Sequence, residues 1–150
     1  MEFLTKSPSQ TKKRALALAK EILRNHFEKA FVLALSGDLG GGKTTFIQGL
    51  AKGLGIREKV LSPTFVIMKR FSIDKGQFRN FYHIDCYRIK YPKEMLDLGF
   101  EEIISDPENI VAIEWAERIR NLLPKNALKM EFEFKGKTKR KIKWQKIKKG

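Results

Sequence analysis

The alternation of apolar and polar residues divides the chain into helices and buried strands. Near the start, apolar residues recur at helical spacing after Ser7-Pro8-Ser9-Gln10, which has the residues of a capping box with proline at the first helical position. We therefore expect a helix over 8–28. His26 falls on the apolar stripe of this helix, and we expect its imidazole to be packed in the core.

Two continuous apolar runs, 31–36 and 109–113, have the length of strands that are buried on both faces. Such runs are typical of parallel sheets in α/β proteins. After the first run, the sequence predicts a helix over 44–52, which ends at Gly53 and Gly55. After the second run, it predicts a shorter helix over 116–122.

The remaining segments predict antiparallel pairs at the edges of the sheet. Strands over 65–71 and 77–85 form one hairpin around Asp74-Lys75-Gly76, and strands near 127–134 and 138–147 close the chain around Gly136. A short helix is expected near 92–98. Together these elements predict an α/β fold with a mixed sheet, parallel at its centre.

The segment Gly37-Asp38-Leu39-Gly40-Gly41-Gly42-Lys43-Thr44 fits the pattern G-x-x-x-x-G-K-[ST] between a strand and a helix. Glycines let backbone N–H groups turn toward phosphate oxygens, and the helix adds the positive end of its dipole. Lys43 can reach the β- and γ-phosphates, and the Thr44 hydroxyl can bind Mg²⁺. The sequence thus predicts a P-loop that binds ATP and Mg²⁺, in a three-layer, P-loop NTPase-like sandwich formed by one domain over 1–150.

Two carboxylates end apolar strands where a P-loop enzyme needs an acid. Glu114 follows 110–113 and Asp85 follows 81–84, so each is expected at the edge of the sheet where the loop lies. One can hold Mg²⁺ while the other orients or activates the attacking water, and the sequence leaves the two roles open. Thr64, in Ser62-Pro63-Thr64, either contacts Mg²⁺ or the γ-phosphate or belongs to an ordinary proline turn.

Composition adds a strong positive charge to this picture. The formal net charge is +14, and residues 135–150 hold nine Lys or Arg and no acid. That segment is either a solvated, lysine-rich strand or a contact for RNA. A single cysteine, Cys86, excludes an internal disulfide, and no apolar run approaches the roughly 18 residues of a membrane helix, so we expect a cytoplasmic protein without a membrane contact. We expect Cys86 to be a small buried residue.

Several segments, in order, resemble one family, the bacterial TsaE proteins (formerly YjeE). They cover essentially the whole chain, although Gly41 stands where the family usually has Ala. The resembling segments are Ser7 with Thr11, the P-loop at 35–46, Ser62-Pro63-Thr64-Phe65, His83-Ile84-Asp85-Cys86-Tyr87-Arg88 and Ile113-Glu114-Trp115-Ala116-Glu117-Arg118.

The resemblance implies an ATPase of the biosynthesis of N6-threonylcarbamoyladenosine (t6A), the modified base beside the anticodon of tRNA. It implies that ATP hydrolysis acts on a TsaB–TsaD complex. By position, it implies that Lys43, Thr44 and Thr45 hold phosphates and Mg²⁺ and that Glu114 and Asp85 are metal-site or catalytic acids. It also implies that Thr64 lies in a switch segment, Thr11 near the adenine, and Trp115 near the nucleotide or partner. Contact with tRNA is indirect or made through 135–150.

Two other classes of protein compete with this interpretation. A small-molecule P-loop kinase needs an acceptor site and arginines that close over the phosphates, for which Arg88 and Arg118 are the available residues. A basic RNA-binding module with a vestigial nucleotide site would rely on 135–150. Trp144 is the aromatic residue of that segment, and it suits strand packing as well as base stacking.

Overall fold

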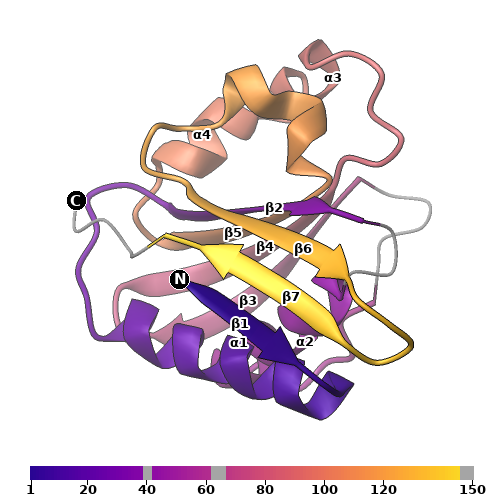
Figure 1. Ribbon diagram of the computed structural model, residues 1–150. Helices are drawn as coiled ribbons and strands as arrows, with labels where there is room; N and C mark the ends of the chain where they lie inside the picture. The colour runs from indigo at the N-terminus through magenta and orange to yellow at the C-terminus, as the bar shows by residue number, and fades with distance from the viewer. Residues whose placement is uncertain (39–41, 62–66, 146–150) are drawn as a thin grey trace.

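A seven-stranded sheet lies between two groups of helices in the computed structural model, which describes residues 1–38, 42–61 and 67–145 (Figure 1). The strands are β1 (Glu2–Thr5), β2 (Phe31–Gly37), β3 (Met68–Lys75), β4 (Phe78–Asp85), β5 (Asn109–Glu114), β6 (Leu128–Phe134) and β7 (Arg140–Trp144). The helices are α1 (Pro8–Leu23), α2 (Lys43–Gly53), α3 (Lys93–Leu96), α4 (Phe100–Ser105) and the 3₁₀ helix η1 (Ala116–Leu122).

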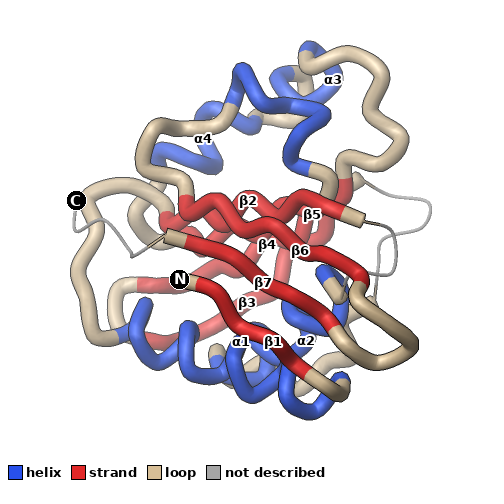
Figure 2. The backbone as a smooth tube through the Cα atoms, viewed as in Figure 1, coloured by secondary structure: helices blue, strands red, loops and turns tan. Residues whose placement is uncertain are grey.

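The strand order is β1-β7-β6-β2-β5-β4-β3. Strands β6, β2, β5 and β4 are parallel, whereas β3, β7 and β1 are antiparallel to their neighbours. Helices α1 and α2 cover one face, and α3, α4 and η1 cover the other (Figures 1 and 2). The predicted α/β sandwich, with a parallel centre and antiparallel edges, is therefore confirmed.

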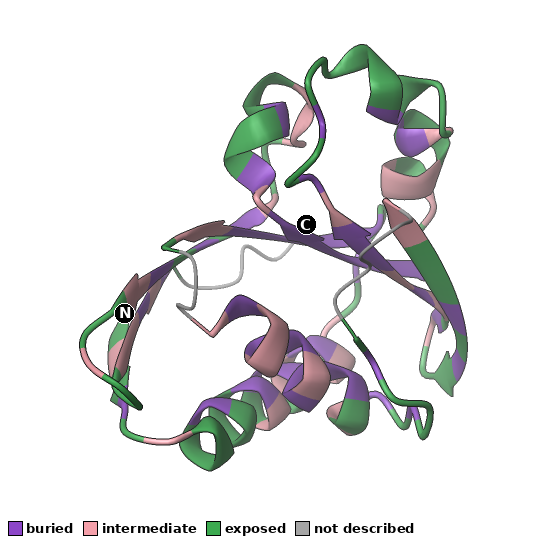
Figure 3. Cartoon of the chain, turned by 90° about the vertical axis from the view of Figure 1, so that its right-hand side faces the viewer, coloured by how far each residue is buried: buried purple, intermediate pink, exposed green. Residues whose placement is uncertain are grey.

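Strand alternation gives the molecule two cores, one on each face of the sheet (Figure 3). Leu33 and Leu35 of β2 and Ala112 of β5 point toward α1 and α2. Their neighbours, such as Ala34 and Ile113, point to the other face, toward η1 and α4. Side chains alternate along a strand. Polar residues at the strand ends that continue the stripe of Leu33, Leu35 and Ala112 therefore also face α1 and α2.

Helix α1 starts as predicted and ends early. The Ser7 hydroxyl accepts a bond of 3.1 Å from the Gln10 N–H, and the Gln10 side chain accepts one of 2.7 Å from the Lys6 N–H. The helix ends at Leu23, and the prediction that His26 is a core residue is wrong, because His26 is exposed. The edge strand β1 and helix α4 were not predicted.

Helices α1 and α2 pack closely through glycines. A Cβ on Gly49 would lie 2.7 Å from the Lys12 Cα, and one on Gly53 would lie 2.6 Å from the Ala19 Cβ. Because the contacts advance along both helices together, α1 and α2 run in the same direction, and the start of α1 lies toward the start of α2. Among the described residues, no helix is long and apolar enough to cross a membrane.

Candidate nucleotide-binding site

The site is built where β2, β4 and β5 end at the same edge of the sheet. Gly37, the last residue of β2, has a φ of 118°, and a Cβ there would collide with the backbone of Phe132 in β6. The chain then turns into the loop, with the Asp38 N–H bound to the Phe132 carbonyl at 3.0 Å. Only glycine suits both the conformation and the close approach at this position.

The loop ends at Gly42, which precedes the first turn of α2 and has a φ of 96°. A side chain at this position would also meet Arg140 of β7, whose Cγ lies 3.4 Å from the site of a Cβ. Arg140 belongs to the terminal hairpin, which β6 and β7 form. It therefore lies against the N-terminal end of α2, which is the positive end of the helix dipole.

Lys43 is buried at the start of α2 and is held by the loop itself. Its ammonium group donates to the carbonyls of Gly37 at 2.8 Å and Asp38 at 2.9 Å, and it lies 4.4 Å from the centre of the Trp115 ring. Burial lowers the pKa of Lys43, and nearby carboxylates, Glu117 first, oppose that shift. The side chain has the charge and position to bind an anion placed at the loop.

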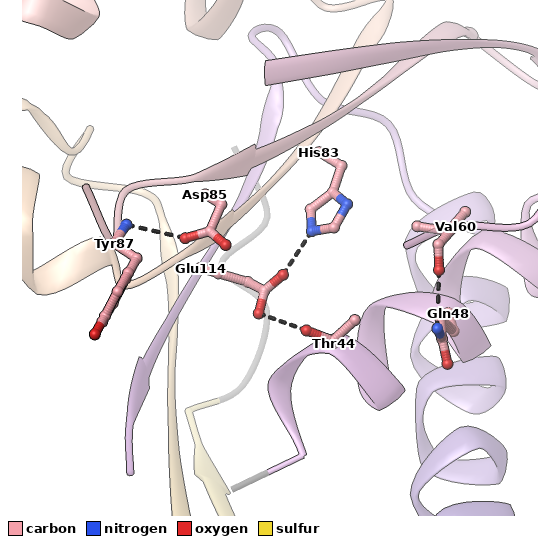
Figure 4. A network of polar contacts seen from close by, with 7 residues as sticks. All are labelled: Thr44, Gln48, Val60, His83, Asp85, Tyr87 and Glu114. Carbon is pink, nitrogen blue, oxygen red and sulfur yellow. Dashed lines mark hydrogen bonds and ion pairs between the residues drawn. The ribbon is translucent and has the colours of Figure 1, made fainter. Parts of the chain in front are cut away.

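Glu114 links the loop helix to the neighbouring strands (Figure 4). One carboxylate oxygen accepts a hydrogen bond of 2.8 Å from the Thr44 hydroxyl, and the other lies 2.7 Å from Nε2 of His83. Both His83 and Glu114 are buried. This network joins α2, β5 and β4 through the two carboxylate oxygens of Glu114.

His83 is a site residue for which the sequence alone predicts no role. It occurs within the segment that resembles TsaE, two residues before Asp85. The alternation of β4 is the signal that could have found it, because it places both residues on the face that carries Glu114.

Asp85 lies beside Glu114, since the two residues are direct partners in the register between β4 and β5. One carboxylate oxygen of Asp85 accepts a hydrogen bond of 2.9 Å from the Tyr87 N–H, which fixes the turn after β4. The structure thus brings both predicted acids to the edge of the sheet beside the start of α2, and it distinguishes them by contact, because the Thr44 hydroxyl donates to Glu114.

Trp115 adopts the left-handed helical conformation, with a φ of 55°. This conformation costs a residue with a side chain about 1–2 kcal/mol. The half-buried indole packs on Tyr87, with ring centres 5.2 Å apart, and against the Lys43 ammonium. Arg118 in turn lies 5.7 Å from the centre of the exposed Tyr87 ring. Trp115 therefore lies between the loop lysine and the surface.

Thr11 and Thr45 lie on the two adjacent helices. Thr11 is buried at the start of α1, where its hydroxyl lies 2.7 Å from that of Thr5. Thr45 is half-buried in the first turn of α2. The other expected site residues, Leu39, Gly40, Gly41 and Thr64, lie outside the described residues.

Part of the positive charge of the terminal hairpin is paired with carboxylates of the same sheet. Lys141 and Lys143 lie 3.3 and 3.5 Å from the Glu2 carboxylate, and Lys135 lies 3.0 Å from Glu133. Trp144 is buried and packs against Phe3, so its ring serves strand packing. Residues 146–150 lie outside the described part of the chain.

The donor set fits a magnesium nucleotide. Mg²⁺ prefers oxygen ligands and is commonly held by one or two carboxylates together with substrate phosphates. The Thr44 hydroxyl and the Glu114 carboxylate are such oxygens, and they already lie together at the start of α2. Within the described residues, no group of three or more His, Cys, Asp or Glu could hold a metal.

A strand that leads through a glycine-rich loop into a helix beginning with Lys-Thr, with an acid at the end of the adjacent parallel strand, defines a P-loop nucleotide-binding protein. The profile of one family, described as threonylcarbamoyl adenosine biosynthesis protein TsaE, matches residues 5–142. The chain belongs to the TsaE family, a family of P-loop ATPases.

Individual relatives agree with this assignment. The TsaE protein of Bacillus subtilis is 38% identical over 143 residues, covering 95% of this chain and 83% of that protein. The TsaE protein of Rickettsia conorii is 36% identical over 135 residues, covering 89% and 71%. The crystal structure of Bacillus subtilis YdiB superposes with a TM-score of 0.70 at 32% identity, covering 99% of this chain and 86% of that one.

Proposed function

We propose that the chain hydrolyses ATP with Mg²⁺ at the Lys43–Thr44–Glu114 site and that hydrolysis serves the t6A modification of tRNA by acting on a TsaB–TsaD complex. Membership of the TsaE family supports the pathway. The single observation that carries the proposed chemistry is the contact between Thr44 and Glu114 at the start of the loop helix, beside the held Lys43 ammonium.

Bound Mg²⁺·ATP would supply the phosphoanhydride bond that is broken and the negative charge that the site neutralises. Lys43 would exchange its two loop carbonyls for phosphate oxygens, which are stronger acceptors. Thr44 would contribute its hydroxyl to the metal, as Thr45 would to the phosphates. Loop residues Asp38 to Gly42 would supply backbone contacts.

The acids would divide the remaining work. Glu114 is oriented by His83 and touches Thr44, which suits it to the metal. Asp85 lies beside it at the strand end and is the candidate to orient the attacking water. Thr64 would act in a switch segment, Thr11 would lie near the adenine, and Trp115 would report the nucleotide to a partner through Tyr87.

The test is ATP hydrolysis by the full chain, measured alone, with a purified TsaB–TsaD complex, and with small phosphate acceptors. We expect hydrolysis that needs Mg²⁺ and no acceptor, and that TsaB–TsaD stimulates. Phosphate transfer that depends on an acceptor would instead identify a small-molecule kinase. Absence of hydrolysis under every condition, with tRNA binding retained in Lys43→Ala, would favour an RNA-binding module with a vestigial site.

A further inference from the structure

The two helical layers carry opposite charge. From Lys6 to Arg24, which includes α1, the sequence has six Lys or Arg and one acid, Glu21. From Arg88 to Glu108, which includes α3 and α4, it has three Lys or Arg and six acids, and η1 of the same layer adds Arg118, Arg120 and Glu117. These layers lie on opposite faces of the sheet (Figure 3). By these counts, the positive charge of the helices is concentrated on the α1 side.

A groove of about 550 Å³ lies on this positive side, between α1, α2 and the segment that follows α2. Four exposed cations line it together with one acid, Glu58. The cations are Lys12, Lys52, Arg57 and Lys59. Within the described residues none of these four makes an ion pair, in contrast to the lysines of the terminal hairpin.

Three further cations of α1 and its C-terminal cap lie outside the lining of this groove. Lys13, Lys20 and Arg24 are exposed and recur at spacings that place them on one stripe of the helix. At about 1.5 Å per residue, this stripe is roughly 16 Å long. A line of separated cations matches a polyanion with repeated phosphates better than one compact anion.

The scarcity of exposed apolar residues favours a nucleic acid over a membrane. Among the described residues between 5 and 61, Leu61 is the one large hydrophobic side chain that is exposed. A helix that binds at a membrane interface needs apolar residues to insert beside its cations. Phosphate contacts on a nucleic acid have no such requirement.

We propose that the α1/α2 basic face, defined by Lys12, Lys13, Lys20, Lys52, Arg57 and Lys59, binds the phosphate backbone of RNA directly. The choice of RNA as the polyanion rests on the role in tRNA modification proposed above. The contact lies on the helical layer, away from the terminal hairpin, where Glu2 and Glu133 already pair with lysines.

The test measures binding of a fluorescent, unmodified tRNA transcript to the full chain over a series of KCl concentrations, without ATP. The groove variant combines Lys12→Gln, Lys52→Gln, Arg57→Gln and Lys59→Gln. The matched control removes the same charge from the hairpin through Lys137→Gln, Lys139→Gln, Lys141→Gln and Lys143→Gln. Melting temperatures verify that both variants fold.

We expect the groove variant to bind at least tenfold more weakly and its log–log salt slope to fall by about 3, as the loss of four phosphate contacts requires. The control should lose less than about threefold. Equal losses would overturn the proposal in favour of net charge alone, and unchanged binding by the groove variant would overturn it outright.

A second binding experiment uses anionic phosphatidylglycerol vesicles in place of tRNA. Binding to vesicles that is as tight as binding to tRNA at the same salt concentration, and that is lost in the groove variant, would contradict the proposal and assign the face to a membrane. Because RNA binding is measured without ATP, failure of the proposed ATPase activity would leave this result readable.

Discussion

At the scale of single residues, Glu114 connects the parts of the site. Its two carboxylate oxygens contact the Thr44 hydroxyl and His83 in a buried setting. A buried carboxylate is costly unless its oxygens are hydrogen-bonded. His83 therefore keeps Glu114 in place, while the oxygen that accepts from Thr44 would be able to exchange that hydroxyl for a metal ion. Lys43 would act differently, because its ammonium group, which is held here by backbone carbonyls, would offer charge to the phosphates.

This difference predicts two separable defects. Lys43→Ala should weaken ATP binding by about 10- to 100-fold, since hydrogen bonds with charged groups contribute about 1.5–3 kcal/mol. Glu114→Ala should reduce turnover far more than binding. Calorimetric titration with ATP and a hydrolysis assay measure the two effects, with Lys52→Ala as the control on the exposed side of the same helix. Equal loss of ATP binding in both variants would count against the division of roles.

Trp115 should report nucleotide binding through its fluorescence. The Lys43 ammonium lies over the indole ring, and its transfer to phosphates would change the charge next to that ring. We expect a change in emission on adding Mg²⁺·ATP that persists in Trp144→Phe and disappears in Trp115→Phe. A signal that follows Trp144 instead would show that Trp115 lies too far from the change.

Cys86 should be protected from thiol reagents. Burial, reinforced by the charges of Asp85 and Glu117, raises the pKa of the Cys86 thiol from 9.0 to about 12. At pH 8.5 we expect the folded chain to react with a disulfide reagent at least about 100-fold more slowly than the urea-unfolded chain. Between pH 9.0 and about 12 the unfolded chain loses this proton first, so the contribution of Cys86 to stability falls as pH rises. Equal reaction rates would contradict the burial of this thiol.

At the scale of elements, sequence patterns predicted those features of helices and strands that contacts between nearby residues determine. The start of α1 follows from Ser7 and Gln10, which bond within one turn. Its end at Leu23 involves a local contact, in which the Asn25 side chain donates to the Glu21 carbonyl, and beyond it a contact distant in sequence, in which Gln77 binds both backbone groups of Phe27. Strand β1 was missed because its partner β7 lies at the other end of the chain.

The candidate site shows the same limit to what local sequence patterns can predict. The positions of Lys43, Thr44, Asp85 and Glu114 could be anticipated, because parallel strands end at one edge. The bond from His83 to Glu114 depends on the register between β4 and β5, and the left-handed conformation of Trp115 has no signal in its own residue type.

The packing of α1 on α2 gives a prediction at this scale. Gly49→Ala would place a methyl group against the backbone of Lys12, which cannot move without shifting α1. Although alanine favours a helix over glycine, we expect a net loss of stability of about 1–3 kcal/mol from overpacking. Thermal unfolding measures it, with Lys52→Ala expected to stay within about 0.5 kcal/mol of the unsubstituted chain. A higher melting temperature for Gly49→Ala would contradict the close contact.

At the scale of the whole molecule, the nucleotide site and the charged surface lie on separate parts of one fold. The site occupies the edge where the parallel strands end, and the α1/α2 basic face covers the outer side of the helices next to it. ATP binding at the loop and contact with macromolecules at the surface are therefore separable by substitution, although one sheet supports both.

We propose that ATP bound at the Lys43–Thr44–Glu114 site controls the association of this chain with a TsaB–TsaD complex. The most direct measurement is a pull-down of purified TsaB–TsaD by the tagged full chain, without nucleotide, with Mg²⁺·ATP and with Mg²⁺·ADP, in the unsubstituted chain and in Lys43→Ala. We predict that retention depends on the nucleotide in the unsubstituted chain and that Lys43→Ala abolishes this dependence. Equal retention under all three conditions, or none under any, would contradict the account.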